Sequence, residues 1–219
     1  MNFAKKEIIL FDLDGTLTES GEGIVNSMEY ALKAYGITDY NRTELFKYLG
    51  PPLIDTFKKE FGFDDLKAVE AVEKFREYFR EIGIYENKLY AGIESLLKNI
   101  SDSGRKIVLA TSKAEVFAVR ILEHFKIIKY FNVVAGSELD GSRIRKGEVI
   151  RYALNKLGTV ELDSAVMIGD RKEDILGAKE VGIDSIGVLY GYGSLEELKN
   201  AGATTIVETV EELNKILIG

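Results

Sequence analysis

From residue 90 onward the sequence alternates between segments of helical periodicity and short apolar runs typical of buried strands. We expect helices over residues 93–103, 114–125, 147–157 and 173–181, and strands over residues 106–110, 131–135, 164–168, 185–189 and 204–207. A helix between successive strands returns the chain across a face of the sheet, so such alternation is typical of parallel strands. The sequence therefore predicts an α/β protein with a doubly wound parallel sheet.

Another apolar run, at residues 8–11, predicts a buried strand that two acids follow. Asp12 and Asp14 are two positions apart, so an extended backbone points both side chains to the same side. They would lie at the carboxyl end of the strand, where open α/β sheets bind ligands. Two crowded carboxylates repel each other and need a cation, a proton or a strong hydrogen-bond donor. A solvated Asp-Gly turn is the alternative interpretation of these residues taken alone.

Residues 18–89 interrupt the alternating pattern with helical periodicity alone. We expect helices over residues 24–35, 42–49, 53–60 and 65–82. This organisation predicts two domains: an α/β core of residues 1–17 and 90–219, and an all-helical cap, hinges included, inserted at residues 18–89. A mobile cap would exclude water during a transfer reaction and admit it afterwards. A rigid helical subdomain is the alternative.

Composition excludes several kinds of site. The chain has no cysteine, which removes cysteine nucleophiles and thiolate metal sites, and one histidine, His124, which excludes multi-histidine metal sites. Its net charge of -7 argues against a general nucleic-acid or anionic-membrane binder. The N-terminus has no signal-peptide pattern, and no apolar run approaches the roughly 20 residues of a membrane span. We expect a cytoplasmic protein without nucleic-acid or membrane partners, and a monomer or weak dimer, although the oligomeric state is open.

Polar residues also follow two of the later strands. Thr111 and Ser112 come after the strand at 106–110, where a hydroxyl would cap the next helix or help to bind an anion. An anionic substrate needs local positive charge, for which Lys113 and Lys146 are the candidates. We expect Lys113 to be a surface lysine; Lys146, which opens the helix at 147–157, is favoured only by the family resemblance given below.

The strand at 164–168 is followed by Gly169 and by two acids four residues apart, Asp170 and Asp174. If the next helix begins near Arg171, both carboxylates face the same way, one turn apart. Oxygen ligands suit Mg²⁺, which keeps several waters and takes one or two carboxylates. The alternative is an acidic first turn that interacts with the helix dipole.

Together these residues resemble the four signatures of the haloacid dehalogenase-like hydrolases, a superfamily made mostly of phosphatases. The matching segments are Asp-Leu-Asp-Gly-Thr-Leu at 12–17, Thr111, Lys146, and Gly-Asp-Arg-Lys-Glu-Asp at 169–174. The helical insertion is similar to the cap of the phosphoglycolate phosphatase and β-phosphoglucomutase subfamily. Members usually have proline after the lysine, whereas this chain has Gly147, which leaves Arg143 and Arg145 open as substitutes.

The resemblance implies a role for each acid. Asp12 would attack phosphorus and form an aspartyl-phosphate, while Asp14 would act first as general acid and then as general base. Mg²⁺ is the expected cofactor. Its ligands would be Asp12, the backbone carbonyl of Asp14, and Asp170, with Asp174 bound directly or through water.

Thr111, Ser112 and Lys146 are expected to bind the phosphoryl group, and three residues of the insertion are expected to contribute to specificity: Glu19, Gly50 and Pro51. Dehalogenases of this fold, as the resemblance implies, need neither Mg²⁺ nor an acid two residues after the nucleophile. We therefore expect a phosphatase for small phosphorylated metabolites, with phosphoglycolate or nucleoside monophosphates as first candidates. A sugar phosphomutase of the β-phosphoglucomutase type and a non-catalytic module that binds phosphate ligands are the alternatives.

Overall fold

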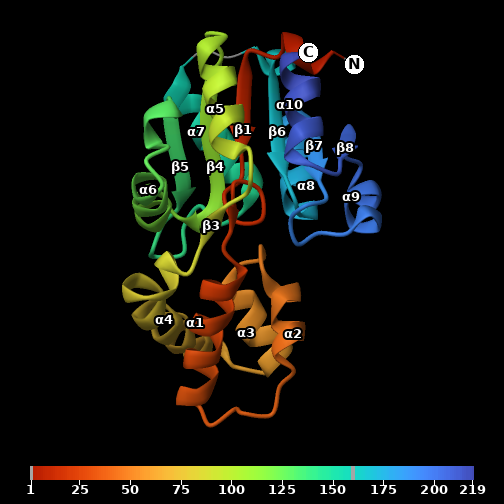
Figure 1. Ribbon diagram of the computed structural model, residues 1–219. Coiled ribbons are helices and arrows are strands. Elements are labelled where there is room, and N and C mark those ends of the chain that lie inside the picture. Colours follow the sequence, from red (N-terminus) through yellow and green to blue (C-terminus); the bar gives the residue numbers. More distant parts are fainter. Residues whose placement is uncertain (1, 159–160) are drawn as a thin grey trace. The chain divides into compact units, whose positions relative to one another are not determined.

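The computed structural model describes residues 2–158 and 161–219, which divide into two compact units (Figure 1). The first unit consists of Met1–Thr18 and Leu89–Gly219 and contains a parallel sheet with helices on both faces. The second unit, Glu19–Lys88, is helical apart from the ends of two short strands. The predicted fold class, a doubly wound α/β core with an inserted helical block, is confirmed.

Within the described residues the sheet has six strands in the order β5-β4-β1-β6-β7-β8, and every pairing is parallel. The strands are β1 (Ile8–Phe11), β4 (Lys106–Ala114), β5 (Val133–Ser137), β6 (Ala165–Gly169), β7 (Asp184–Val188) and β8 (Thr205–Val207). Ile8 of β1 is in register with Lys106 of β4 on one side and with Ala165 of β6 on the other. The order of the strands reverses at β1, so the crevice at its carboxyl end is where a sheet of this kind binds ligands.

Helices cover both faces of the sheet, which explains why all four residues of β1 are apolar and buried. Ile8 and Leu10 belong to a cluster with residues of α7 (Lys146–Leu157) and α8 (Lys172–Val181). Ile9 and Phe11 alternate to the opposite face. Helices α5 (Ile93–Asp102), α6 (Glu115–His124), α9 (Leu195–Ala201) and α10 (Val210–Ile218) complete this unit, with the 3-10 turns η1 (Phe3–Lys5), η4 (Ile128–Tyr130) and η5 (Leu162–Ser164).

The helical unit has an apolar core of its own. It consists of α1 (Gly21–Ala34), α2 (Arg42–Leu45), α3 (Leu53–Phe61) and α4 (Asp65–Glu81), with the 3-10 turns η2 (Phe46–Tyr48) and η3 (Gly83–Tyr85). Met28 and Leu32 of α1 are fully buried, as is Phe57 of α3. Phe75 and Phe79 of α4 stack with ring centroids 5.5 Å apart. Two short strands, β2 (Thr18–Glu19) and β3 (Lys88–Leu89), pair with each other where the chain passes between the units.

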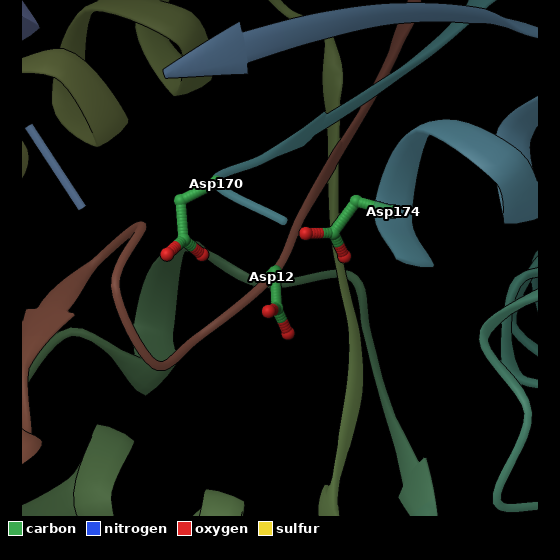
Figure 2. A group of neighbouring side chains, drawn as sticks. All are labelled: Asp12, Asp170 and Asp174. Carbon is green, nitrogen blue, oxygen red and sulfur yellow. The ribbon is translucent and has the colours of Figure 1, made fainter. Parts of the chain in front are cut away.

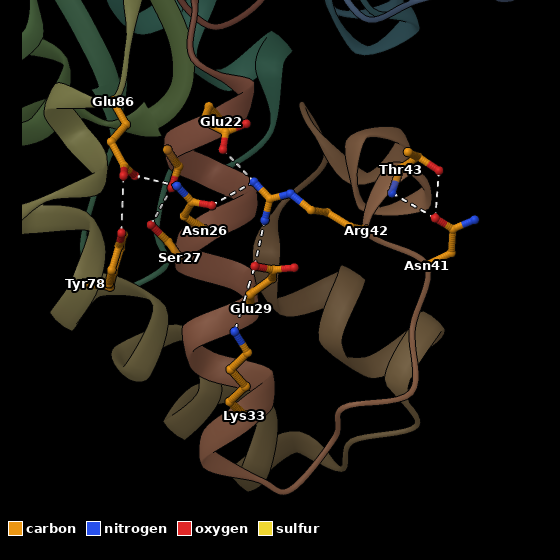
Figure 3. A network of polar contacts seen from close by, with 11 residues as sticks. Glu22, Asn26, Ser27, Glu29, Lys33, Asn41, Arg42, Thr43, Tyr78 and Glu86 are labelled. Atoms are coloured by element: carbon orange, nitrogen blue, oxygen red, sulfur yellow. Dashed lines mark hydrogen bonds and ion pairs between the residues drawn. The ribbon is translucent and has the colours of Figure 1, made fainter.

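A polar network in the helical unit joins α1 to α2 (Figure 3). Arg42, the first residue of α2, forms ion pairs with Glu22 at 2.7 Å and with Glu29 at 2.6 Å. It also donates a hydrogen bond to Asn26 Oδ1 at 2.7 Å. Two carboxylates therefore hold this guanidinium, which fixes the start of α2 against α1.

One strand differs from the expectation in its length. The strand expected at 106–110 continues to Ala114, because after a bulge Ala114 pairs with Ser137 of β5. Helix α6 begins only at Glu115, and Ala114 is the residue that precedes it. The prediction that Thr111 or Ser112 caps this helix is therefore wrong.

No helix of the described residues is long and apolar enough to cross a membrane.

Candidate active site

Asp12 and Asp14 lie where the chain leaves β1. The backbone N–H of Asp12 donates to the carbonyl of Ile168 at 2.9 Å, which extends the pairing of β1 with β6 by one residue. The chain then turns back, and the N–H of Gly15 donates to the carbonyl of Thr18 at 2.8 Å. Gly15 has a φ of 79°, a left-handed conformation that glycine adopts without steric cost. The turn thus keeps both acids at the carboxyl end of the central strand.

Asp170 and Asp174 come from the end of the neighbouring strand, β6. Asp170 directly follows β6, and Asp174 lies in the first turn of α8, where its Oδ2 accepts the N–H of Arg171 at 3.1 Å. A Cβ atom on Gly169 would lie 2.1 Å from Cγ of Asp174, so a side chain there would displace the carboxylate. One carboxylate oxygen from each of three residues, Asp12, Asp170 and Asp174, lies within 4.8 Å of the other two (Figure 2). Residues from both ends of the chain therefore form one buried acidic cluster.

Lys146, the first residue of α7, contributes the positive charge closest to this cluster. Its Nζ lies 2.8 Å from Asp12 Oδ1 and 2.8 Å from Asp174 Oδ1, and it donates to the carbonyl of Ala110 at 3.0 Å. Burial by itself would lower the pKa of Lys146, but Asp12 and Asp174 outweigh it and raise the pKa above its ordinary value. The lysine therefore stays charged between the two carboxylates.

The pKa values of Asp170 and Asp174 are raised, which indicates that Lys146 does not neutralise the negative charge of the three acids. Burial, and after it the charges of Asp174 and Asp12, raise the pKa of Asp170 well above its ordinary value. Burial also raises the pKa of Asp174 to about 7, although Lys146 opposes that shift. Fully ionised, three carboxylates and one ammonium leave two negative charges in a buried place. A divalent cation would supply the missing charge, and an all-oxygen donor set suits a hard cation.

Lys113 forms a further ion pair of the site, and the expectation that it lies on the surface is wrong. Its Nζ lies 2.9 Å from Asp14 Oδ2, and its side chain is only 9% exposed. The other oxygen of Asp14, Oδ1, is buried and accepts no hydrogen bond from the described residues. Lys113 thus orients Asp14 through one oxygen and leaves the other available.

The remaining residues expected in the site lie in two places. Leu109 of β4 is in register with Phe11, so Thr111 lies at the same edge of the sheet as Asp12. Thr111 is buried and its Oγ1 accepts the N–H of Lys113 at 3.2 Å, while Ser112 is half-buried. Three residues expected to contribute to specificity belong to the helical unit: Glu19, Gly50 and Pro51. Glu19 forms an ion pair with Lys88 at 3.7 Å.

Other residues of the site had weaker signals in the sequence. Lys113 lies in the polar segment after Ala110, where nothing in the sequence indicates that the strand continues. Lys146 contacts Asp12, whereas Arg143 is held by Glu115 at 3.4 Å and by Glu138 at 2.5 Å. Arg145 stands before the first residue of α7. Of the three basic residues considered, Lys146 is therefore the one that contacts Asp12. The backbone contacts that orient Asp170 had no signal in the sequence.

Comparison with known proteins identifies the family. The sequence pattern of the haloacid dehalogenase-like hydrolases matches residues 9–188. A 5'-nucleotidase from Pseudomonas aeruginosa is 43% identical over 209 residues, which cover 95% of this chain and 94% of the relative. The chain belongs to the haloacid dehalogenase-like hydrolase family. The predicted family and the prediction of an enzyme are both confirmed.

Other relatives of this hydrolase have different names. The tyrosine-protein kinase PtkA of Mycobacterium tuberculosis is 37% identical over 213 residues, which cover 96% of this chain and 72% of the relative. A phosphoglycolate phosphatase from Colwellia psychrerythraea is 26% identical over 221 residues and 97% of each chain. The crystal structure of a predicted phosphatase from Clostridium acetobutylicum superimposes with a TM-score of 0.93 at 48% identity, covering 96% of this chain and 97% of that one.

Proposed function

We propose that this hydrolase is a Mg²⁺-dependent phosphatase that cleaves small phosphomonoesters through an aspartyl-phosphate on Asp12. One observation carries the proposal: Asp12, Asp170 and Asp174 form a buried cluster of three acids, and one lysine, Lys146, forms ion pairs with two of them. Without further positive charge this cluster would repel an anionic ester. A site that needs both a cation and a phosphate-binding lysine is what phosphoryl transfer requires, because positioning and charge neutralisation dominate its catalysis.

The residues present fit Mg²⁺. Its ligands would be the carboxylates of Asp12, Asp170 and Asp174 and the backbone carbonyl of Asp14, with water in the remaining positions. Bound there, the ion would supply positive charge next to the carboxylates and the incoming phosphate. Lys146 would contribute a second, permanent positive charge next to Asp12.

The side chains divide the reaction into two displacements. An oxygen of Asp12 attacks phosphorus, the ester P–O bond breaks, and the leaving alkoxide takes the proton of Asp14. Water then attacks phosphorus, the bond from phosphorus to Asp12 breaks, and Asp14 accepts the proton of that water. Phosphate is released and both carboxyl groups return to their initial state. Lys113 contacts Asp14 through Oδ2, which leaves Oδ1 as the oxygen that would carry and deliver the proton.

Phosphoryl oxygens would be bound by Lys146, by the hydroxyl of Thr111 and by the backbone N–H of Ser112. Nucleoside monophosphates are the first substrates to test, because the relative of 43% identity is named a 5'-nucleotidase. Phosphoglycolate is the second, on the name of the more distant relative. We further propose that the helical unit acts as a cap and contributes to specificity through Glu19, Gly50 and Pro51.

A phosphate-release assay over nucleoside monophosphates, phosphoglycolate and sugar phosphates tests the function. We expect steady release with Mg²⁺ and loss of at least a hundredfold of the rate after chelation, since a lost metal removes several kcal/mol of charge stabilisation. Turnover that is indifferent to removal of divalent ions would contradict the metal. Interconversion of sugar phosphates without phosphate release, dependent on a bisphosphate, would instead indicate a mutase.

The variant Asp12→Asn tests the covalent route. It should abolish phosphate release while the midpoint of thermal unfolding stays within a few degrees of the wild type. Asp102→Asn is the matched control, because Asp102 is an exposed aspartate of α5 whose ion pair with Lys98 lies on the surface. A surface pair of this kind contributes little, so its activity should be unchanged. Substantial activity in Asp12→Asn would refute the aspartyl-phosphate.

A further inference from the structure

The loop formed by residues 190–193, which follows β7, lies directly against Asp170. The backbone N–H of Tyr192 donates to Asp170 Oδ2 at 2.8 Å. From the opposite side, the hydroxyl of Thr16 donates to Asp170 Oδ1 at 3.3 Å. Each oxygen of this fully buried carboxylate therefore has one donor from the protein, and the two donors together fix the orientation of its plane.

Two glycines allow the loop to approach so closely. A Cβ atom on Gly191 would lie 2.3 Å from the carbonyl oxygen of Gly15 and 2.4 Å from Cβ of Asp170. A Cβ atom on Gly193 would lie 1.8 Å from the carbonyl oxygen of Asp170. Both distances are far below van der Waals contact, so no other residue fits at these positions without moving the backbone. Gly191 and Gly193 are thus required by the close packing of the loop against Asp170 and Gly15.

The same loop is tied to the turn that follows β1. The hydroxyl of Tyr190 donates to the carbonyl of Thr16 at 3.1 Å, and its ring packs edge-on against Tyr90 with centroids 5.0 Å apart. Three hydrogen bonds thus connect the loop with the other two turns: Tyr190 donates to Thr16, Thr16 donates to Asp170, and Tyr192 donates to Asp170. The turns after β1, β6 and β7 therefore hold one another, and the acids that they carry keep a fixed separation.

We propose that residues 190–193 form a positioning loop that orients Asp170 for a divalent cation, with the N–H of Tyr192 as its effective group. This inference rests on the proposed metal-dependent function. The loop itself contacts neither substrate nor cation. It acts by holding one carboxylate oxygen in a hydrogen bond, so that Asp170 meets the cation without first having to rotate.

Two variants of Tyr192 isolate the N–H group. Tyr192→Pro removes the ring and the N–H donor, whereas Tyr192→Ala removes the ring and keeps the donor. Calorimetric titration of each metal-free protein with Mg²⁺ measures its affinity. We expect Tyr192→Ala to bind Mg²⁺ within about threefold of the wild type, and Tyr192→Pro to bind about 10- to 100-fold more weakly, because a hydrogen bond to a charged group is lost. Enzyme saturated with Mg²⁺ should show the effect of proline mainly in kcat rather than in KM.

Variants at two further positions keep the test decisive if proline prevents folding. Gly191→Ala should also weaken Mg²⁺ binding, since its Cβ displaces Asp170. Thr16→Val should weaken it through loss of the hydroxyl donor, and Thr16→Ser, which keeps a hydroxyl, should restore it. Equal Mg²⁺ affinity in wild type, Tyr192→Pro and Gly191→Ala would overturn this inference alone. Failure of the wild-type protein to bind any divalent cation would overturn the proposed function and this inference with it.

Discussion

Lys113 illustrates how a residue away from the main acidic cluster can control the reaction. Its ammonium lies 2.9 Å from Asp14 Oδ2, and both side chains are largely buried. A charged hydrogen bond in such a place is worth about 1.5–3 kcal/mol. Without it, Asp14 would occupy several orientations, of which few deliver a proton to the leaving group.

We therefore expect Lys113→Ala to lower kcat about 10- to 100-fold, with a smaller effect on KM. Steady-state kinetics on the best substrate of the phosphate-release assay measures both constants. Lys98→Ala is the control, because Lys98 is a 61% exposed lysine of α5 and its loss should not change either constant. Wild-type kinetics in Lys113→Ala would show that Asp14 is held by other contacts.

Asp174 gives the protein without metal a specific dependence on pH. Burial raises the pKa of this carboxyl to about 7, whereas its ordinary value is 3.8. The folded state therefore keeps a proton that the unfolded chain has lost. The higher proton affinity of the folded state contributes to the free energy of unfolding. This contribution is fully present below pH 3.8 and is lost as the pH rises through 7.

In the presence of a chelator, the midpoint of thermal unfolding should consequently fall more steeply between about pH 4 and pH 7 in the wild type than in Asp174→Asn. Asparagine does not titrate, so the difference between the two curves isolates the contribution of Asp174. Scanning calorimetry at several pH values measures it. Parallel curves would mean that Asp174 ionises in the folded state as it does in the unfolded chain.

At the residue scale, the sequence predicted the acids better than the groups around them. Asp12, Asp14, Asp170 and Asp174 each follow a predicted buried strand, so strand ends alone placed them at one edge. The role of the N–H of Tyr192 could not be predicted, because every residue except proline has an N–H group. Its position depends on how two turns pack together.

Among the elements, α1 depends on a close approach of two backbones within the helical unit. A Cβ atom on Gly23 of α1 would lie 2.0 Å from the carbonyl oxygen of Gly83 in η3. A Cβ atom on Gly83 would in turn lie 2.6 Å from Oγ of Ser27. The start of α1 can therefore pack on η3 only while both positions lack a side chain.

Gly23→Ala tests this contact. Alanine favours a helix over glycine by about 1 kcal/mol, but a forced overlap of this kind typically costs about 1–3 kcal/mol. Because the overlap is with backbone, we expect the cost to exceed the gain and the free energy of unfolding to fall. Urea denaturation measures it, with Lys33→Ala, an exposed position of the same helix, as a control expected to change by less than about 0.5 kcal/mol. A stabilised Gly23→Ala would show that η3 moves aside easily.

The elements themselves could mostly be predicted from periodicity, with one instructive exception. The apolar faces of helices such as α4 and α7 predict them from the sequence, and their predicted ends differ from the observed ends by about one residue. The extension of β4 to Ala114 could not be predicted, because its last residues are polar and no longer alternate. Pairing of Ala114 with Ser137 on β5 keeps that segment extended, and such a contact is tertiary.

For the molecule as a whole, a cation bound in the acidic cluster would couple metal binding to folding. Asp12 is separated from Asp170 and Asp174 by more than 150 positions in the sequence, so only the folded chain brings the three acids together. A cation that binds the folded state alone stabilises it by about 2.7 kcal/mol at a hundredfold excess over its dissociation constant.

Saturating Mg²⁺ should therefore raise the midpoint of thermal unfolding by roughly 5–10 °C, since each kcal/mol shifts a chain of this size by about 2–4 °C. Scanning fluorimetry measures this shift, and sodium chloride at equal ionic strength is the control that should not reproduce it. Asp170→Asn should reduce the shift strongly. An equal shift in that variant would place the cation elsewhere.

The central position of β1 has a consequence for synthesis of the protein. Its partners on either side, β4 and β6, are translated roughly a hundred and a hundred and sixty residues later. While the ribosome makes the intervening chain, Ile8–Phe11 is an apolar strand with two open edges and no sheet to join. Chaperones that recognise short apolar segments would bind this stretch, and a nascent chain arrested before β6 would leave it open to aggregation.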